Sequence, residues 1–245
     1  MTSSSETNET ASTFPVSPVN RVKRAHHRGT YDKKTVYEIL DAALVCHIAY
    51  VIDGRPYCTP TGFWREGDHL YWHGSSASRM IRTQGQGIDV CLTVTHLDSL
   101  VMARSGLHHS VNYRAVMAFG KAHVVEDTAE KVKLMDNFID RIYPGRSKII
   151  RQPHPQELKA TTMLSMEIET ASGKIRNTHV ADEEEDYEGV PAWSSLYPIT
   201  PVLGEPSDCP RQLPGLTRPE GMVDFEPGSR FDELMSKTYR QTFGS

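Results

Sequence analysis

Residues 44–74 read LVCHIAYVIDGRPYCTPTGFWREGDHLYWHG. Three runs rich in β-branched and aromatic residues are separated here by two polar turns, Asp53-Gly54 and Glu66-Gly67-Asp68. Asp-Gly between two such runs is the strongest short-range signal for a β-hairpin. The segment therefore predicts an antiparallel meander of three strands.

Helical and strand patterns continue on both sides of this meander. Upstream, DKKTVYEILDAA places Val36, Ile39 and Leu40 at helical spacing, with Thr30 or Asp32 available as N-cap. Downstream we expect a short helix at 76–84, followed by two strands joined by a turn at Leu97-Asp98. A long strand over 113–127 comes next, with a bulge or close backbone approach at Gly120. A helix over 128–143 and one last strand within 161–176 complete the pattern. Strands in hairpin order with two or three helices predict a mainly β (α+β) fold, a small β-barrel decorated by helices.

The two ends of the chain differ in composition from its centre. Ser, Thr, Asn and Pro dominate the start, so we expect residues 1–27 to be a disordered tail. Residues 191–245 hold eight of the fifteen prolines, so we expect residues 201–245 to be a Pro-rich extension with at most one short helix, at FDELMSKTYRQTF. The folded domain is then residues 28–200.

Charge and composition exclude several classes of partner. The formal net charge is −4 and the basic residues are scattered, apart from RVKRAHHR at 21–28, which we interpret as a solvated linker; no nucleic-acid partner is expected. No run reaches the roughly 18 apolar residues of a membrane span, and the N-terminus lacks the pattern of a signal peptide. The four cysteines show no CxxC spacing and are interpreted as buried free thiols. We expect a cytoplasmic protein without a membrane partner.

Residues 70–80, LYWHGSSASRM, join an apolar strand to a Ser-rich turn that ends in arginine. A phosphate site needs backbone N–H donors, small residues that let the anion approach, and a cation, and the segment from Gly74 to Arg79 supplies all three. Serine also caps helices, so a plain strand-to-helix turn remains the alternative. Read alone, His73 fits a histidine packed at the end of a strand better than a functional residue.

Further segments follow one another in a recognisable order between residues 28 and 198. They are TYDKKTVYEILDAA, VCHIAYVIDGRPYCTPTGFW, LYWHGSSASRM, ARSGLHHSVNYRAVMAFGKA, and EIETASGKIR with EDYEGVPAW. This order resembles the pyridoxamine 5′-phosphate oxidase-like superfamily, and within it the flavin-nucleotide-binding branch that contains nitroimidazole-resistance proteins. The resemblance implies a split β-barrel of about six to seven antiparallel strands, a homodimer that binds FMN between its subunits, and an FMN-dependent oxidoreductase acting on a small molecule.

The resemblance also assigns the phosphate site residue by residue. Ser78 and Arg79 match the family's Ser-Arg-Lys clamp, and Met80 stands where many relatives have lysine. That departure removes one cation. Arg79, the hydroxyls of Ser75, Ser76 and Ser78, and backbone amides are therefore expected to hold the phosphate.

Other family positions lie outside the clamp. Thr59-Pro60-Thr61 matches the strand whose backbone lines the isoalloxazine, and His73 stands where relatives carry a histidine beside the flavin or its substrate, which makes it the predicted catalytic residue. Tyr113-Arg114 lies in an NYRSV-like strand, and Trp193 resembles an aromatic that closes the groove from the partner subunit. The family's KVRTGPP is here KIRNTHV and its WAG-like triplet is WSS, which leaves the substrate open.

Haem remains the alternative cofactor. If His108 and His109 are strand neighbours they face opposite ways, so they form no metal pair, but one of them can point into the groove as an axial haem ligand. Some split-barrel relatives bind haem instead of flavin. The alternative function is therefore a non-catalytic haem- or flavin-binding carrier or sensor. No metal site is predicted, and the acidic run 182–186 is interpreted as a solvated loop.

Overall fold

The computed structural model describes residues 12–244. Its elements are η1 (His26–Arg28), β1 (Gly29–Thr30), α1 (Lys33–Asp41), β2 (Val45–Ile52), β3 (Arg55–Glu66), β4 (His69–Ser75), α2 (Arg79–Gln84), β5 (Gln86–Met102), β6 (Ser110–Val124), α3 (Thr128–Ile142), η2 (Arg146–Ile149), α4 (Pro155–Ala160), β7 (Thr161–Glu167), β8 (Thr170–Arg176), α5 (Glu184–Gly189), β9 (Ser195–Pro198), η3 (Glu220–Met222) and α6 (Phe231–Phe243).

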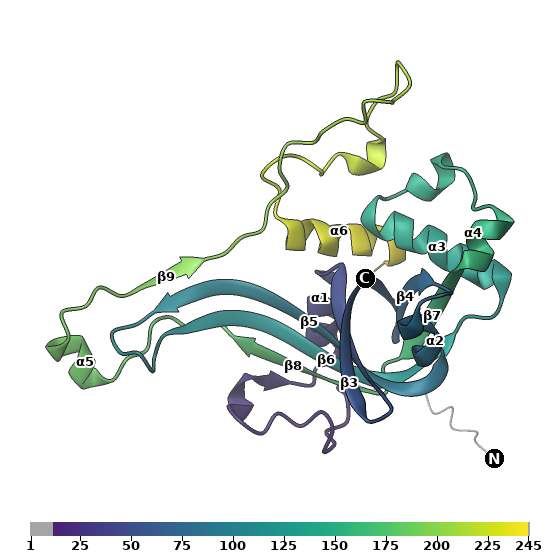
Figure 1. Cartoon of the computed structure of the whole chain (residues 1–245). Coiled ribbons are helices and arrows are strands. Elements are labelled where there is room, and N and C mark those ends of the chain that lie inside the picture. Colours follow the sequence, from purple (N-terminus) through teal and green to yellow (C-terminus); the bar gives the residue numbers. More distant parts are fainter. Residues whose placement is uncertain (1–11, 245) are drawn as a thin grey trace, which may run out of the picture.

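The strands form one antiparallel sheet that closes into a ring. Neighbours follow the order β1-β8-β6-β7-β4-β3-β2-β5-β9, and an additional β5–β6 pairing closes a barrel from β6 through β7, β4, β3, β2 and β5. β5 and β6 run on beyond the barrel as a long arm, with β8 and β9 beside them (Figure 1). The predicted fold class, a split β-barrel with helices around it, is confirmed.

The opening meander forms for the reasons the sequence suggests. Asp53 and Gly54 both have positive φ, 50° and 75°, as a tight two-residue hairpin turn requires. In β2, Cys46, Ile48 and Tyr50 are buried while the residues between them face outward. This alternation places one face of β2 in the barrel core.

Two strand predictions were wrong in detail. Residues 86–102 form the single strand β5, with a register shift between Leu97 and Ser99 where a turn was predicted. The predicted last strand is divided into β7 and β8, which follow β6 one after the other. Gly120 lies at this division, and a Cβ there would come within 2.2 Å of the Glu167 carbonyl oxygen. The predicted close approach at Gly120 is confirmed.

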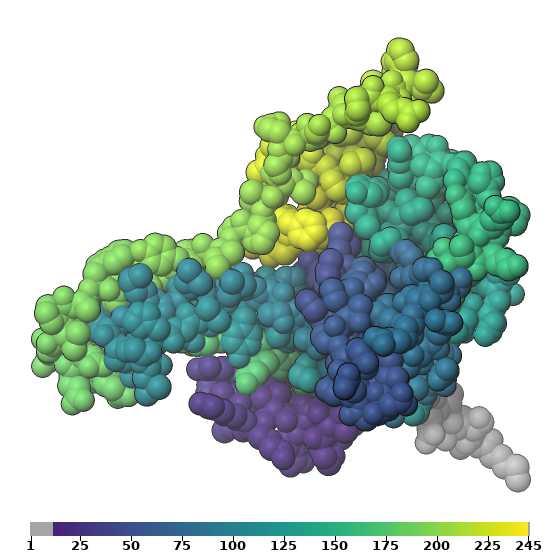
Figure 2. Space-filling model, viewed as in Figure 1, coloured from purple at the N-terminus to yellow at the C-terminus, as the bar shows by residue number. Residues whose placement is uncertain are grey.

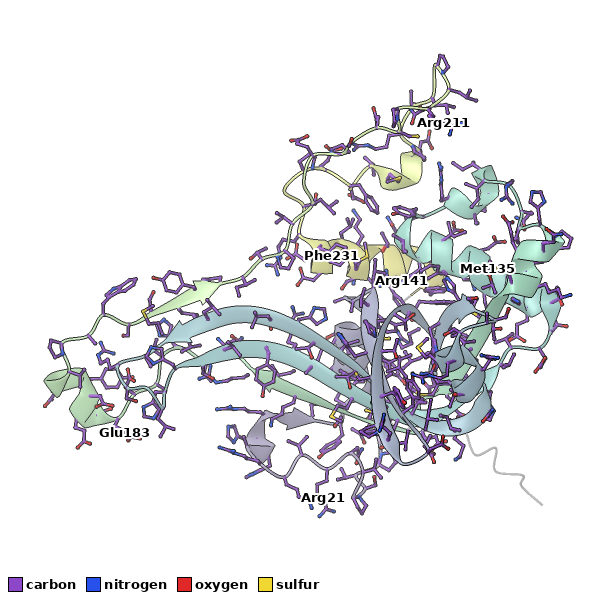
Figure 3. The ribbon with its side chains drawn as sticks, in the orientation of Figure 1. Arg21, Met135, Arg141, Glu183, Arg211 and Phe231 are labelled. Atoms are coloured by element: carbon purple, nitrogen blue, oxygen red, sulfur yellow. The ribbon has the colours of Figure 1, made fainter. Side chains whose placement is uncertain are left out.

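Helices α3 and α6 pack together against the outside of the barrel. Arg141 of α3 is buried, and its guanidinium donates to the Met235 carbonyl oxygen at 2.8 Å, to Thr238 Oγ1 at 2.9 Å and to the Asp41 carbonyl oxygen. Figure 3 shows Arg141 between the two helices. The helix predicted at FDELMSKTYRQTF is therefore confirmed as α6, and it is fixed to the body of the molecule.

The N-terminal segment differs from the expected disordered tail where it is described. Phe14 is 3% exposed within the barrel's core cluster, and the Asn20 side chain donates to the Ala171 carbonyl oxygen at 3.0 Å. Residues 12–27 thus pack under the arm, as the purple segment of Figure 2 shows, and residues 1–11 lie outside the described part. The Pro-rich segment between β9 and α6 stands away from the body, with Arg211 near its tip (Figure 3).

Candidate functional site

The pairing between β3 and β4 ends part-way along both strands. These strands pair only from Phe63↔Trp72 to Glu66↔His69. Beyond that, β3 continues beside β2 and β4 continues beside β7 as far as Ser75↔Thr161. We call this place the β3–β4 opening. Thr59–Thr61 and His73–Ser75 lie on its two borders, so the structure brings these two predicted groups to one feature.

Small polar groups and one cation lie at the β4 end of the opening. The Ser76 backbone N–H donates to the Ala160 carbonyl oxygen at 2.8 Å, and the Ser78 N–H donates to the Ser75 carbonyl oxygen at 2.9 Å. Ser78 is the N-cap of α2, yet its hydroxyl makes no capping hydrogen bond. The turn is therefore held by backbone hydrogen bonds, which leaves the Ser78 hydroxyl available to a ligand.

Arg79 reaches across the opening from α2 to β3. Its guanidinium carbon lies 4.8 Å from the centre of the Tyr57 ring, and Tyr57 stacks on Tyr50 with ring centres 5.6 Å apart. Arg79 forms no ion pair with any of residues 12–244. Gly74 is also required here, because a Cβ would lie 2.8 Å from Ile81 Cγ1. An exposed guanidinium beside serine hydroxyls has the chemistry of a phosphate site.

Met80 does not face this cradle. Its side chain packs against the barrel's hydrophobic core cluster. The residue at the family's lysine position is thus part of the core, and Arg79 is the cation that α2 offers at its first turn.

His73 lies on the same border as Ser75, in β4 and against α3. Its ring packs edge-on against Phe138 with centres 5.1 Å apart, and its Nδ1 is buried without a hydrogen-bond partner among the described residues. Burial lowers the pKa of His73 below its ordinary value, because the charged imidazolium is poorly solvated there. His73 is therefore a neutral imidazole near pH 7 that can donate or accept one further hydrogen bond.

In the stretch Thr59-Pro60-Thr61, successive side chains point alternately into and out of the barrel. Thr59 pairs with the buried Ile48 and so faces inward, where its Oγ1 lies 3.2 Å from the Tyr50 hydroxyl. Pro60 faces outward and is exposed. Within this stretch, Thr59 therefore contacts Tyr50 inside the barrel, and Pro60 lies on the outer surface of the barrel.

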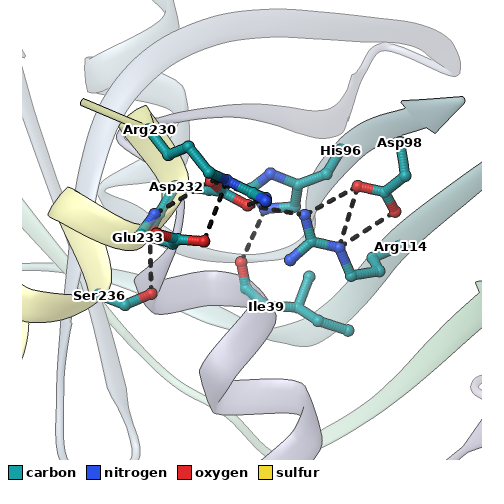
Figure 4. Close-up of polar contacts among 8 residues, drawn as sticks. All are labelled: Ile39, His96, Asp98, Arg114, Arg230, Asp232, Glu233 and Ser236. Atoms are coloured by element: carbon teal, nitrogen blue, oxygen red, sulfur yellow. Dashed lines mark hydrogen bonds and ion pairs between the residues drawn. The ribbon is translucent and has the colours of Figure 1, made fainter. Parts of the chain in front are cut away.

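Arg114 is not at the opening. Its Nε and Nη2 donate to the Asp98 carboxylate at 3.1 and 2.8 Å, and Nη2 also donates to Asp232 of α6 at 3.1 Å (Figure 4). Hydrogen bonding to Asp98 raises the pKa of Arg114. Tyr113 beside it pairs with Leu97 in the arm. Within one chain, Arg114 therefore fixes α6 to the arm.

Trp193 lies at the far end of the arm from α2, just before β9 (Figure 1). It is 70% exposed and contacts Tyr197 edge-on, with ring centres 6.1 Å apart. Within one chain, Trp193 is therefore distant from the opening.

The assignment of His108 and His109 to a strand was wrong. Both lie in the turn between β5 and β6, at the tip of the arm. His108 Nδ1 is 2.7 Å from Ser105 Oγ, and His109 Nδ1 is 2.8 Å from the Ser105 carbonyl oxygen. The first residue of the acidic run, Asp182, accepts hydrogen bonds from Arg104 here, so it is not a simple solvated position.

The family model described as pyridoxamine 5′-phosphate oxidase matches residues 32–175. The chain belongs to this family. No curated protein matches the sequence.

Two solved structures resemble this member of the pyridoxamine 5′-phosphate oxidase family over most of their length. The flavocytochrome Anf3 from Azotobacter vinelandii is 42% identical, with a TM-score of 0.80 over 86% of this chain and 98% of that chain. The FAD and haem binding protein from Mycobacterium smegmatis is 30% identical, with a TM-score of 0.77 over 83% of this chain and 99% of that chain. The resemblance found in the sequence is confirmed at the level of family and fold.

A cavity of about 890 Å³ that was not predicted lies between α1, the β3–β4 turn and α6 of this family member. Tyr37, Arg65, Tyr239 and Phe243 are among its lining residues. Its walls come from segments far apart in the chain, which is why no local motif announces it. No helix among residues 12–244 is long and apolar enough to cross a membrane.

Proposed function

We propose that this chain is a flavin-dependent oxidoreductase that also binds haem and acts on a small molecule. The observation that carries this proposal is its 42% identity to a flavocytochrome over 98% of that protein. The second relative, named for both FAD and haem, supports the same pair of cofactors. A bound flavin would supply reversible transfer of hydride or single electrons, and the protein would supply binding and orientation.

The β3–β4 opening is the proposed flavin site. Arg79 and the hydroxyls of Ser75, Ser76 and Ser78 would hold the phosphate, since this cation has no carboxylate partner among the described residues. The backbone of Thr59, Pro60 and Thr61 would border the flavin ring. Met80, predicted as a cofactor contact, would act only by packing behind the cradle.

His73 is the proposed hydrogen-bonding residue beside the flavin. Its buried Nδ1 has no partner among the described residues, and burial keeps it neutral. A neutral imidazole can hold a proton on one nitrogen at physiological pH, as a proton-donating neighbour must.

The phosphate next to riboflavin is common to FMN and FAD, so the cradle suits both. We expected FMN from the sequence; the relative named for FAD now favours FAD. Mass spectrometry of the cofactor released from purified protein distinguishes the two.

A homodimer would complete the site. Trp193 is exposed at the far end of the arm, and Tyr113 and Arg114 lie on the same arm, so these three could meet the β3–β4 opening only of a second copy. We also propose a cytoplasmic location, because all four cysteines are free. Cys58 and Cys209 are exposed, unlike the buried thiols expected from the sequence, and Cys46 is buried.

A carrier that binds flavin or haem without turnover is the second candidate. It is favoured by the fact that His73, the predicted catalytic residue, is half-buried with its ring packed against Phe138. Purified, cofactor-loaded protein should be mixed with NADH or NADPH and with oxygen or a nitroaromatic acceptor. Flavin reduction followed by multiple turnovers supports the oxidoreductase, and a bound flavin that completes no turnover supports the carrier.

A further inference from the structure

An uncharged surface covers the outside of four neighbouring barrel strands. In β2, Val45, His47 and Ala49 face outward, because the residues between them are buried. On β3 they pair with Gly62, Pro60 and Cys58 in turn. On β5, Thr93 pairs with His47 and Cys91 pairs with Ala49. On β6, Met117 pairs with Thr93, Phe119 with Cys91, and Ala115 with Thr95. We call these residues the uncharged patch.

The uncharged patch is accessible in the single chain. Val45 is 58% exposed and Met117 is 45% exposed. Three strand spacings by two row spacings give it about 14 by 13 Å, which suits a flat, largely apolar molecule of porphyrin size. No Asp, Glu, Lys or Arg is among its residues, although 24% of the whole chain is charged.

His47 is the histidine of this patch. It lies in the central row, between Pro60 on one side and Thr93 on the other, and it is exposed. Among residues 12–244, neither nitrogen of its ring takes part in a hydrogen bond or ion pair. An axial haem ligand needs such a free imidazole nitrogen on an apolar surface.

Other histidines fit this role less well. His96 Nε2 lies 3.0 Å from the Ile39 carbonyl oxygen, and His73 is covered by Phe138. His108, one of the two histidines that the sequence suggested for haem, lies beside the carboxylates of Asp182 and Glu183 at the tip of the arm. A charged, polar turn does not suit a porphyrin face.

We propose that His47 is an axial haem ligand and that the uncharged patch is the surface against which the haem packs. This inference rests on the proposed function, specifically on its haem. It also places the two cofactors side by side, since Pro60 belongs both to the row of His47 and to the stretch proposed to border the flavin. Electrons could then pass between flavin and haem across β3.

The test is a titration of flavin-loaded, haem-free protein with hemin, followed by the Soret band and by electron paramagnetic resonance. His47→Ala should weaken hemin binding by more than about 100-fold, since even second-shell partners of metal sites contribute 10–100-fold. Added imidazole should restore the wild-type spectrum of the variant, which a merely structural role of His47 would not produce. His109→Ala, an exposed histidine outside the patch, is the matched control and should bind hemin as the wild type does.

Each outcome decides a different claim. If wild type binds hemin and His47→Ala shows the same affinity and spectrum, the assignment of His47 is overturned while the two-cofactor function stands. If wild type binds flavin but not hemin, the haem part of the function and this inference both fail. Thr95→Lys places a charge in the patch; if it dissociates a dimer but leaves hemin binding intact, the patch is a contact between copies and the proposal is overturned. Unchanged flavin binding shows that each variant is folded.

Discussion

Replacing Arg79 by alanine should weaken flavin binding without unfolding the protein. Among the described residues the guanidinium contacts the face of Tyr57 and pairs with no carboxylate, so the apoprotein loses little. Hydrogen bonds to a charged group contribute about 1.5–3 kcal/mol each, so losing one to the phosphate should raise the flavin Kd roughly 10- to 150-fold. The assay is fluorescence titration of apoprotein with FMN and with FAD.

The neighbouring Arg82→Ala is the matched control for this prediction. Arg82 is an exposed arginine on the same short helix, in its last turn, and it differs from Arg79 in making no contact with Tyr57. Arg79→Lys should fall between wild type and alanine, because it keeps the charge and loses the planar guanidinium. The phosphate cradle is refuted if Arg79→Ala leaves the flavin Kd unchanged, or if Arg82→Ala raises it by as much.

Three further predictions concern the framework around the site. Arg65→Met should lower the free energy of unfolding by roughly 3–5 kcal/mol, measured by urea denaturation, because it leaves the Asp41 carboxylate buried and unpaired. Gly120→Ala should cost at least about 1–3 kcal/mol in the same assay, because its Cβ would meet the backbone oxygen of Glu167. The pKa of His73 is lowered by burial, so the unfolded chain takes up a proton more readily and stability should fall as pH drops from about 6.5 through the lower folded pKa. In thermal melts recorded at a series of pH values, the His73→Leu variant should lose less stability than the wild type over this pH range.

The first two of these predictions have matched control variants. Lys121→Met removes an exposed ion pair with Asp89 and should change stability by less than about 1 kcal/mol. Gly106→Ala adds a methyl group to open space and should be within about 0.5 kcal/mol of wild type. Equal losses for the buried and exposed members of either pair would contradict the packing described here. An unchanged pH profile in His73→Leu would mean that His73 is not buried as a neutral group.

Local patterns predicted most of the fold. The Asp53-Gly54 turn, the helix over 128–143 and the close approach at Gly120 each depend on residues near in sequence or on one special backbone position. The predicted turn at Leu97-Asp98 was wrong. Aspartate is common in turns, but Asp98 accepts hydrogen bonds from Arg114 on the next strand. An ion pair across strands has no local signature.

The candidate site was predictable in part. Arg79 and the serines before it were predicted from their residue types together with the resemblance to the family, and they lie near the place where β3 and β4 no longer pair. Arg114 was assigned to the cofactor because its strand resembles the family's NYRSV, and its second partner, Asp232, lies 118 residues away and cannot be read from that motif. His47, the proposed haem ligand, was not among the predicted residues, although the outward positions of VCHIAYVI carry no charge.

An absorbance spectrum of the purified protein from the near-ultraviolet to the red, with mass spectrometry of the released cofactors, tests the central claim most directly. The proposed function predicts the two flavin bands together with a Soret band, and masses of a flavin nucleotide and of haem. The proposed function would be contradicted if protein purified from a host supplied with flavin and haem carried neither cofactor and took up none of FMN, FAD and hemin when these are added.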